Sequence, residues 1–307
     1  MRGRIQVGLG LAGLAAAFIG LSSVAKSQPA PHDHGATGSN GSGHAGHAGH
    51  TTGGATTVPA GLQLVQDGYR LEVVTPELAV GPTGDFRFRI VGPDGAPVRQ
   101  YRPTHEKELH LIVARRDLSG FQHLHPTRGD DGVWSVPLRV QAAGQYRVFA
   151  DFQPAARGEA MTLGADVPAP GDYRPVRLPS ADRTAVVAGY TVTMAGDPRV
   201  GADATLAFSV SRDGRPVTDL EPYLGAYGHL VALRAGDLAY LHTHPDGAPG
   251  DGRTAAGPGI TFHTQLPSVG VYRFFLDFQH AGAVHTAEFT VVAGGPGAGP
   301  GPTGSGG

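Results

Sequence analysis

The sequence has 307 residues, a formal net charge of −2 and no cysteine, so disulfides, thiolate nucleophiles and four-cysteine zinc sites are excluded. No basic face is visible in it, and we therefore expect no nucleic-acid partner. The chain contains 48 glycines and 25 prolines. The positions at which these residues cluster indicate which parts of the chain can fold.

Residues 1–27 follow the three-part plan of a secretory signal peptide. Arg2 and Arg4 precede an uncharged apolar run from Val7 to Val24, and small residues follow. The run is also long enough for an uncleaved N-terminal anchor, the only membrane contact that we expect. Either alternative predicts an extracytoplasmic protein, whether secreted, periplasmic or on the cell surface. Cleavage would remove three basic residues and no acid, which takes the net charge from −2 to −5.

Residues 28–60 and 294–307 are rich in Gly, Ser, Thr, Ala and Pro and contain few large apolar residues. Such segments cannot bury enough surface to offset the entropy of ordering, so both are predicted to be flexible. The first contains a histidine tract that can chelate a transition metal without prior folding, and we interpret it as metal capture rather than as a neutral linker: His32, His34, His44, His47 and His50.

The sequence between these segments is repeated. Separate landmarks align at one offset of 119 residues: Asp94-Gly95 with Asp213-Gly214, Pro97-Val98 with Pro216-Val217, His110-Leu111 with His229-Leu230, and residues 123–126 with 242–245. Several coincidences at one offset indicate an internal duplication.

Past that point the offset becomes 126, and GQYRVFADFQ (144–153) matches GVYRFFLDFQ (270–279). The change indicates an insertion in the second copy, around residues 247–258. The repeat therefore predicts two modules, residues 61–175 and 176–293. A short Pro-containing linker at 168–183 would join them.

Each module is predicted to consist of strands. The segments 86–91, 108–114, 133–140 and 145–152 are short, rich in β-branched and aromatic residues, and separated by turn signals. No stretch shows sustained helical periodicity. We predict an all-β fold of two tandem Greek-key β-sandwiches of immunoglobulin or cupredoxin type, with a cupin-like barrel as the alternative.

The same histidine triplet occurs in both modules: His110, His123 and His125 in the first, and His229, His242 and His244 in the second. In a strand, residues i and i+2 share one face, and the first histidine of each triplet would lie on the neighbouring strand, about 5 Å away. Three convergent imidazoles suit Zn(II) or Cu(II) and leave at least one open coordination position. Histidines satisfied by backbone hydrogen bonds are the alternative, but the repetition favours metal binding.

Other residues could support these triplets. Asp151 and Asp277, in the repeated Asp-Phe-Gln element, could orient a ring by accepting its N–H, although solvent-facing strand positions are the default interpretation. Met161 and His285 lie near the last strand of each module and could join a copper site. The remaining histidines have no partner in the other copy and are predicted to lie on the surface: His105, His263 and His280.

The HLIV run starting at His110, the HLHP and HTHP segments and the DFQ strands resemble exported bacterial heavy-metal-binding proteins, broadly the CopC-like and YtkA-like copper-associated β-sandwich families. The resemblance covers both modules through short motifs. It implies binding of copper or a related metal by the two triplets, in the periplasm or on the cell surface. The chain lacks Met-rich stretches, so Cu(II) or Zn(II) is expected rather than Cu(I).

The leading hypothesis is therefore an exported protein that sequesters, buffers or delivers Cu(II) or Zn(II), with a metal-transport protein as a candidate partner. The alternatives are a structural or adhesive protein of tandem sandwiches and a cupin-like metalloenzyme. A cupin needs a Glu soon after HxH and a further His; the first copy offers Asp130 and Asp131, and has Pro137 where the second has His263. With no general acid or base identified, we expect no enzyme.

Overall fold

The computed structural model describes residues 58–294, and within that range every helix or strand element is a β-strand. No helix among these residues could span a membrane. The predicted signal peptide or anchor, the histidine tract and nearly all of the predicted C-terminal tail lie outside the described residues. Both modules belong to a single compact unit.

The first module is a sandwich of two antiparallel sheets with strand orders β1-β2-β3-β7-β6 and β5-β4-β8-β9. The orders β2-β3-β7-β6 and β5-β4-β8-β9 correspond to the ABED and C′CFG sheets of an immunoglobulin sandwich. Its strands are β1 (Val65–Gln66), β2 (Tyr69–Val73), β3 (Thr83–Val91), β4 (Leu109–Arg115), β5 (Gln122–Leu124), β6 (Thr127–Arg128), β7 (Val133–Arg139), β8 (Gly144–Phe152) and β9 (Met161–Ala169).

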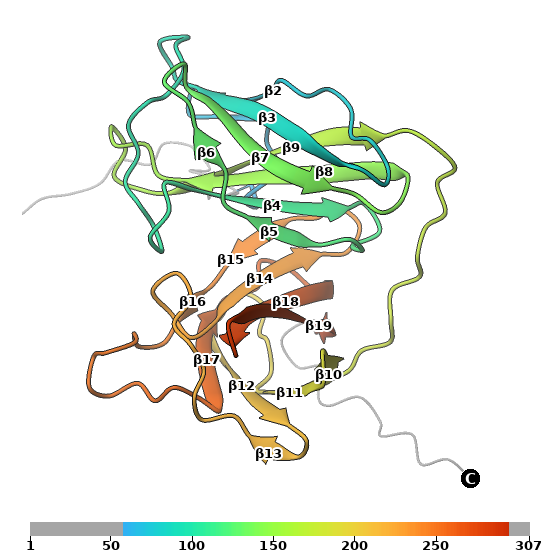
Figure 1. Cartoon of the computed structure of the whole chain (residues 1–307), viewed down its shortest axis with the longest axis vertical. Coiled ribbons are helices and arrows are strands. Elements are labelled where there is room, and N and C mark those ends of the chain that lie inside the picture. The colour runs from blue at the N-terminus through green and yellow to red at the C-terminus, as the bar shows by residue number, and fades with distance from the viewer. Residues whose placement is uncertain (1–57, 295–307) are drawn as a thin grey trace, which may run out of the picture. The chain divides into compact units, whose positions relative to one another are not determined.

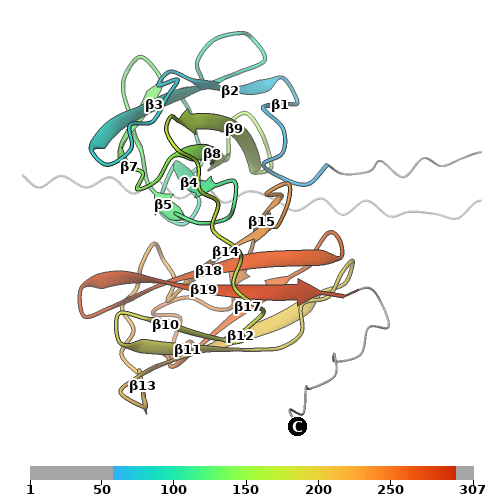
Figure 2. The ribbon, with the colours of Figure 1, turned by 90° about the vertical axis from the view of Figure 1, so that its right-hand side faces the viewer.

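The second module repeats this arrangement in sheets β10-β11-β12-β17-β16 and β15-β14-β18-β19, with β13 added on β12 (Figures 1 and 2). The prediction of two tandem sandwiches is confirmed, and the cupin-like barrel is wrong. The strands are β10 (Thr184–Val187), β11 (Tyr190–Ala195), β12 (Ala204–Arg212), β13 (Arg215–Pro216), β14 (His229–Arg234), β15 (Tyr240–His242), β16 (His244–Pro245), β17 (Gly259–Thr264), β18 (Gly270–His280) and β19 (Ala283–Ala293).

The four strands predicted for the first module correspond to β3, β4, β7 and β8, with ends that differ by at most a few residues. The start of the linker differs, because β9 continues through Pro168 to Ala169 and pairs with β8 there. The chain without regular structure is therefore 170–183, and most of it is exposed.

A tyrosine near the start of the F-type strand fixes the corner of each sandwich. Tyr146 on β8 donates its hydroxyl to the Ala142 carbonyl at 2.8 Å, and Tyr272 on β18 donates to the Ser268 carbonyl at 2.9 Å. This is the tyrosine corner of immunoglobulin domains, in which a core cysteine follows two residues later. Here Val148 occupies that position in the first module and is fully buried. Hydrophobic packing thus replaces the disulfide.

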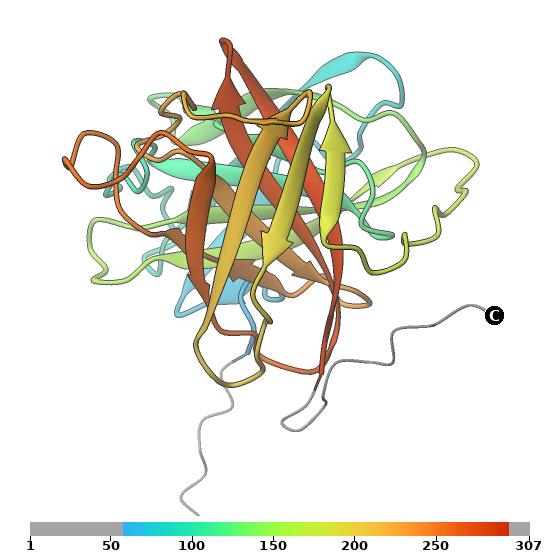
Figure 3. The ribbon, with the colours of Figure 1, turned by 90° about the horizontal axis from the view of Figure 1, so that it is seen from below.

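The inner sheet of each module is covered on both faces. On β4, Leu109 and Leu111 lie in the core of the first module, whereas Ile112 lies in a third hydrophobic cluster together with Val231 and Phe275 of the second module. The sheet β5-β4-β8-β9 therefore packs against β15-β14-β18-β19 (Figure 1). The other sheet of the second module, β10-β11-β12-β17-β16, lies on the far side of that module (Figure 3).

Candidate metal centre

The first triplet converges on the face of the inner sheet that meets the second module. His123 on β5 lies opposite Ile112 on β4, and the same register brings His110 opposite His125, just beyond β5. His110, Ile112, His123 and His125 therefore share one face. The ring centroids of the three histidines are 4.9 to 5.3 Å apart.

Hydrogen bonds fix which nitrogens of the triplet face one another. His110 donates Nε2–H to the Thr104 carbonyl at 2.9 Å, which leaves a lone pair on Nδ1. That Nδ1 is 3.0 Å from Nε2 of His123, whose Nδ1 is 2.8 Å from Oδ2 of Asp277. Both contacts of His123 can be hydrogen bonds only when each of its nitrogens carries a proton. A metal ion between His110 and His123 would take the place of the Nε2 proton.

The third histidine has an unpartnered nitrogen. Nε2 of His125 is buried and has no hydrogen-bond partner, an arrangement that costs about 1–3 kcal/mol unless a ligand satisfies the atom. One ligand atom from each of His110, His123 and His125 lies within 4.8 Å of the other two. Two nitrogens bound to one Zn(II) at about 2.0–2.1 Å are about 3.3 Å apart in a tetrahedral site. The 3.0 Å contact between His110 and His123 is close to that spacing.

Burial keeps two of these histidines, His110 and His125, in the neutral form that binds metal. Desolvation lowers the pKa of His110 to about 4, against a raising contribution from its bond to Thr104. Burial, followed by the nearby His123 and His110, lowers the pKa of His125 to about 3. Because the neutral imidazole is the ligand, a metal ion near neutral pH would not have to displace protons from these two rings.

In the second module, His229 repeats the local geometry of His110. It donates Nε2–H to the Tyr223 carbonyl at 2.8 Å, and burial lowers its pKa to about 4. His242 is the last residue of β15 and lies opposite Val231, whereas His244 begins β16. The side chains of His242 and His244 are outside what the structure describes, so convergence of the second triplet stays a prediction.

The two aspartates of the repeated element are buried, and the default interpretation as solvent-facing residues is wrong. Asp277 is 3% exposed; its Oδ1 accepts a bond from Thr286, and its Oδ2 meets His123 of the first module. Asp151 is 7% exposed and accepts bonds from Thr162 and from Tyr240 of the second module. Each carboxylate therefore contacts the other module. The sequence could not show this, because both faces of these strands are covered.

Met161 and His285 do not belong to the site. Thr162 and Thr286 point toward the aspartates, and since side chains alternate along a strand, their neighbours Met161 and His285 point the other way. Met161 is 4% exposed and lies in the core of the first module. The ring of His285 packs against that of Tyr190, with centroids 4.6 Å apart.

His105, expected on the surface, is half-buried beside the triplet. Its ring centroid is 5.1 Å from that of His229 and 6.1 Å from that of His110. With His110, His123 and His229 it lines a cavity of about 10 Å³ between the modules. A comparison of the two repeats does not identify His105 as a candidate ligand, because the equivalent residue in the second module is Leu224.

The other two unmatched histidines lie elsewhere. The side chain of His263 is 60% exposed, as expected of a surface residue. His280 is half-buried; Nδ1 is 2.7 Å from the Tyr190 hydroxyl and Nε2 is 3.1 Å from Asp219 Oδ1. Both partners belong to the second module, so His280 is accounted for structurally.

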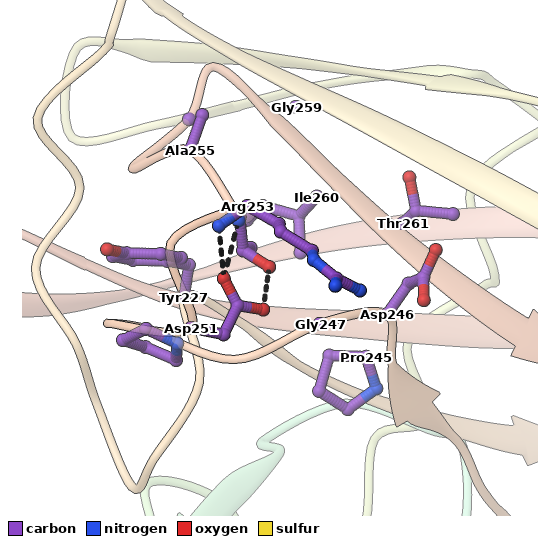
Figure 4. A pocket seen from close by; sticks show the side chains of 13 residues that line it. Tyr227, Pro245, Asp246, Gly247, Asp251, Arg253, Ala255, Gly259, Ile260 and Thr261 are labelled. Carbon is purple, nitrogen blue, oxygen red and sulfur yellow. Dashed lines mark hydrogen bonds between the residues drawn. The ribbon is translucent and has the colours of Figure 1, made fainter.

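The insertion of the second copy forms a hollow of about 570 Å³ (Figure 4). Asp251 accepts bonds there from the backbone N–H groups of Arg253 and Thr254 and from the Thr254 hydroxyl. These bonds hold the pKa of Asp251 well below its usual range. The carboxylate therefore orders its own loop, and we assign no ligand to this hollow.

The model of one protein family matches the chain twice. It is described as a domain of unknown function, DUF8832, and it matches residues 63–170 and 185–295. No curated protein matches the chain.

Similar solved structures include FdeC, an Escherichia coli adhesin, at 17% identity, with 76% of this chain and 66% of that chain covered and a TM-score of 0.24. Invasin, a bacterial integrin-binding protein, is 10% identical; the match covers 74% of this chain and 39% of that chain, with a TM-score of 0.22. Escherichia coli alpha-2-macroglobulin is 12% identical; the match covers 74% of this chain and 20% of that chain, with a TM-score of 0.24. The chain spans 66% or less of the length of each of these chains.

Proposed function

We propose that this chain, which belongs to the DUF8832 family and carries its domain twice, is a protein that binds Cu(II) or Zn(II) on His110, His123 and His125. The observation that carries the proposal is the buried, unpartnered Nε2 of His125 beside two further ring nitrogens. Both metals accept neutral imidazole nitrogen. An ion in this position would satisfy the nitrogen of His125 and remove the need for a proton between His110 and His123.

Asp277 supports the proposal through its contact with His123. Metal-ligating histidines commonly donate their second ring N–H to a carboxylate, which fixes the tautomer and the ring orientation. With Nδ1–H directed to Asp277 Oδ2 at 2.8 Å, His123 would present the lone pair of Nε2 to a metal. This is the orienting role that the sequence suggested for Asp277, although the ring belongs to the other module.

We favour binding over catalysis because the nearby carboxylates are already engaged. Asp277 pairs with His123 and Thr286, and Asp151 accepts from Thr162 and Tyr240. A carboxylate acts as a general base only when it is within reach of a substrate proton, and both of these carboxylates are buried and bonded to protein groups. The proposed role is therefore sequestration, buffering or delivery of the metal outside the cytoplasm, as residues 1–27 and the resemblance to copper-associated proteins suggest.

The test is a calorimetric titration with Cu(II) and with Zn(II). The N-terminal histidine tract could bind metal independently of the folded modules. The parent protein is therefore the full chain with five histidines changed to serine: His32, His34, His44, His47 and His50. His125→Ala removes a proposed metal ligand whose Nε2 makes no hydrogen bond within the protein. We therefore expect one of the metal-binding events in the titration to become at least about tenfold weaker. His263→Ala, at an exposed position, is the matched control. Equal affinities and stoichiometry in parent and His125→Ala would contradict the proposal.

A structural or adhesive role is the second candidate. It is favoured by the backbone bonds of His110 and His229, which satisfy one nitrogen of each ring as a purely structural histidine requires. Thermal unfolding separates the two functions. A ligand bound only by the folded state, at one hundred times its Kd, stabilises a protein by about 2.7 kcal/mol. A structural role predicts the same melting temperature with and without metal.

A further inference from the structure

We propose that His105 of the first module binds the same metal ion as His229 of the second, so that one site is completed across the module boundary. The inference rests on the proposed function and extends it. It adds a ligand that the repeated triplets do not contain, and it makes the two sites of the protein chemically different.

The spacing of the two rings matches that of a ligand pair. The centroids of His105 and His229 are 5.1 Å apart, within the 4.9 to 5.3 Å range found inside the first triplet. Because His229 donates Nε2–H to Tyr223, its lone pair lies on Nδ1. Both rings border the cavity of about 10 Å³ that His110 and His123 also line. This space is about that of one water molecule, so the rings meet with little room for solvent.

The backbone holds His105 in this place at a conformational cost. Residues 104–107 form a tight turn closed by two backbone hydrogen bonds, of 2.9 and 3.1 Å. Its central residues, His105 and Glu106, have φ angles of 47° and 64°. Residues with a Cβ rarely adopt this left-handed region, and such strain clusters at ligand sites. The turn also supplies the Thr104 carbonyl that orients His110.

The corresponding turn of the second module contains no imidazole. Residues 223–226 have the same hydrogen bonds, and Leu224 and Gly225 have φ angles of 51° and 74°. The turn therefore forms in the second module with leucine at the position of His105, so the backbone of the turn does not by itself require an imidazole there. The ring of Tyr223 packs instead against His125 at 6.1 Å. The first triplet thus gains no fourth imidazole from this turn.

His105 also lies where a metal ion could approach. It borders a second pocket of about 540 Å³, together with Thr104, Asp151 and Met161. Among the described residues, His105 is the one histidine that lines both this larger pocket and the small cavity that His229 also lines. A buried metal site needs a path for the ion, and His105 is placed to bind an ion that arrives through the larger pocket.

The experiment is a Cu(II) titration of the full chain, followed by calorimetry and by electron paramagnetic resonance. The parent has the five tract histidines changed to serine. His105→Leu introduces the residue that the second module tolerates at the same backbone angle, and His105→Asn keeps a residue suited to left-handed backbone. His263→Ala is the matched control. We expect both His105 variants to weaken one binding event at least about tenfold and to remove one nitrogen from its spectrum.

The event that His125→Ala weakens should keep its affinity in the His105 variants. Unfolding of the metal-free variants shows whether each is folded, and if His105→Leu is not, His105→Asn decides. Affinities of the His105 variants within tenfold of the parent, with an unchanged nitrogen count, overturn this proposal and leave the proposed function standing. A parent that binds no Cu(II) overturns both.

Discussion

Nδ1 of His123 and Oδ2 of Asp277 lie 2.8 Å apart, although 154 positions separate the two residues in the chain. The side chains are 7% and 4% exposed, so the contact is shielded from solvent. One partner is a candidate metal ligand of the first module, and the other belongs to β18 of the second. A second hydrogen bond also crosses the module boundary, but here the carboxylate belongs to the first module: Tyr240 of the second module donates to Asp151. Side chains of both modules therefore contribute to the candidate site, and we expect any metal affinity of this site to depend on how the modules pack.

Replacement of Asp277 by Asn should weaken metal binding at the first triplet. The substitution removes the charge that holds His123, and loss of such a partner typically costs 10–100-fold in affinity. Calorimetric titration with Cu(II) measures this. Thr286→Val is the matched control, because it removes the bond to Oδ1 of Asp277 and leaves the contact with His123 in place. An equal loss in both variants would show that Asp277 acts through the fold and not through His123.

Phe275→Ala should strongly destabilise the protein. Phe275 is fully buried, and its ring stacks on that of Phe121 across the module boundary with centroids 3.9 Å apart. Truncation of a buried Phe costs about 3–5 kcal/mol. Urea unfolding measures the change, and Val269→Ala, at a position 57% exposed, should stay within about 0.5 kcal/mol. A loss below about 1 kcal/mol for Phe275→Ala would mean that this cluster does not hold the modules together.

The sandwich could be predicted from the sequence because its outer strands alternate. On β12, buried and exposed residues follow one another from Ala204 to Val210, and this pattern identifies a strand with one solvated face. β4 and most of β8 are buried on both faces. Such continuous runs predict a strand but do not say which face meets the module's own core. The packing of one module on the other was therefore not predictable.

The site was partly predictable for related reasons. The i, i+2 spacing of His123 and His125 follows from strand geometry alone, and the structure brings both rings to His110. The pairing of Asp277 with His123 was not predictable, because no local pattern connects residues 154 positions apart. His105 lies in a turn of left-handed residues whose central pair lacks the glycine or asparagine that signals such a turn. No feature of the sequence could place it beside His229.

Acid should destabilise the metal-free protein between about pH 6.5 and pH 4. Burial lowers the pKa of His110 to about 4, of His229 to about 4 and of His125 to about 3. As pH falls below 6.5, the unfolded chain takes up protons that the folded chain does not. The free energy of unfolding therefore falls with pH, and the stabilisation is fully present above pH 6.5.

The matched variant for this titration is His110→Gln, which can still donate to the Thr104 carbonyl. It should flatten the dependence of unfolding free energy on pH near pH 5 by about 1.4 kcal/mol per pH unit, the effect of one proton. Urea unfolding at pH 7, 6 and 5 in the presence of a chelator measures the slope. His263→Gln, at an exposed site, should leave it unchanged. Parallel curves for parent and His110→Gln would contradict the assignment.

Glu106→Gly should stabilise the fold by about 0.5–1 kcal/mol, because glycine adopts left-handed backbone without the penalty that a Cβ imposes. Glu106 has a φ of 64°, and the second module already has Gly225 at the equivalent position. Lys107→Gly is the control in the same turn; Lys107 is not among the left-handed residues, so glycine there should destabilise by about 0.5–1 kcal/mol. Urea unfolding compares the two. If both variants lose stability equally, the turn that presents His105 stores no strain.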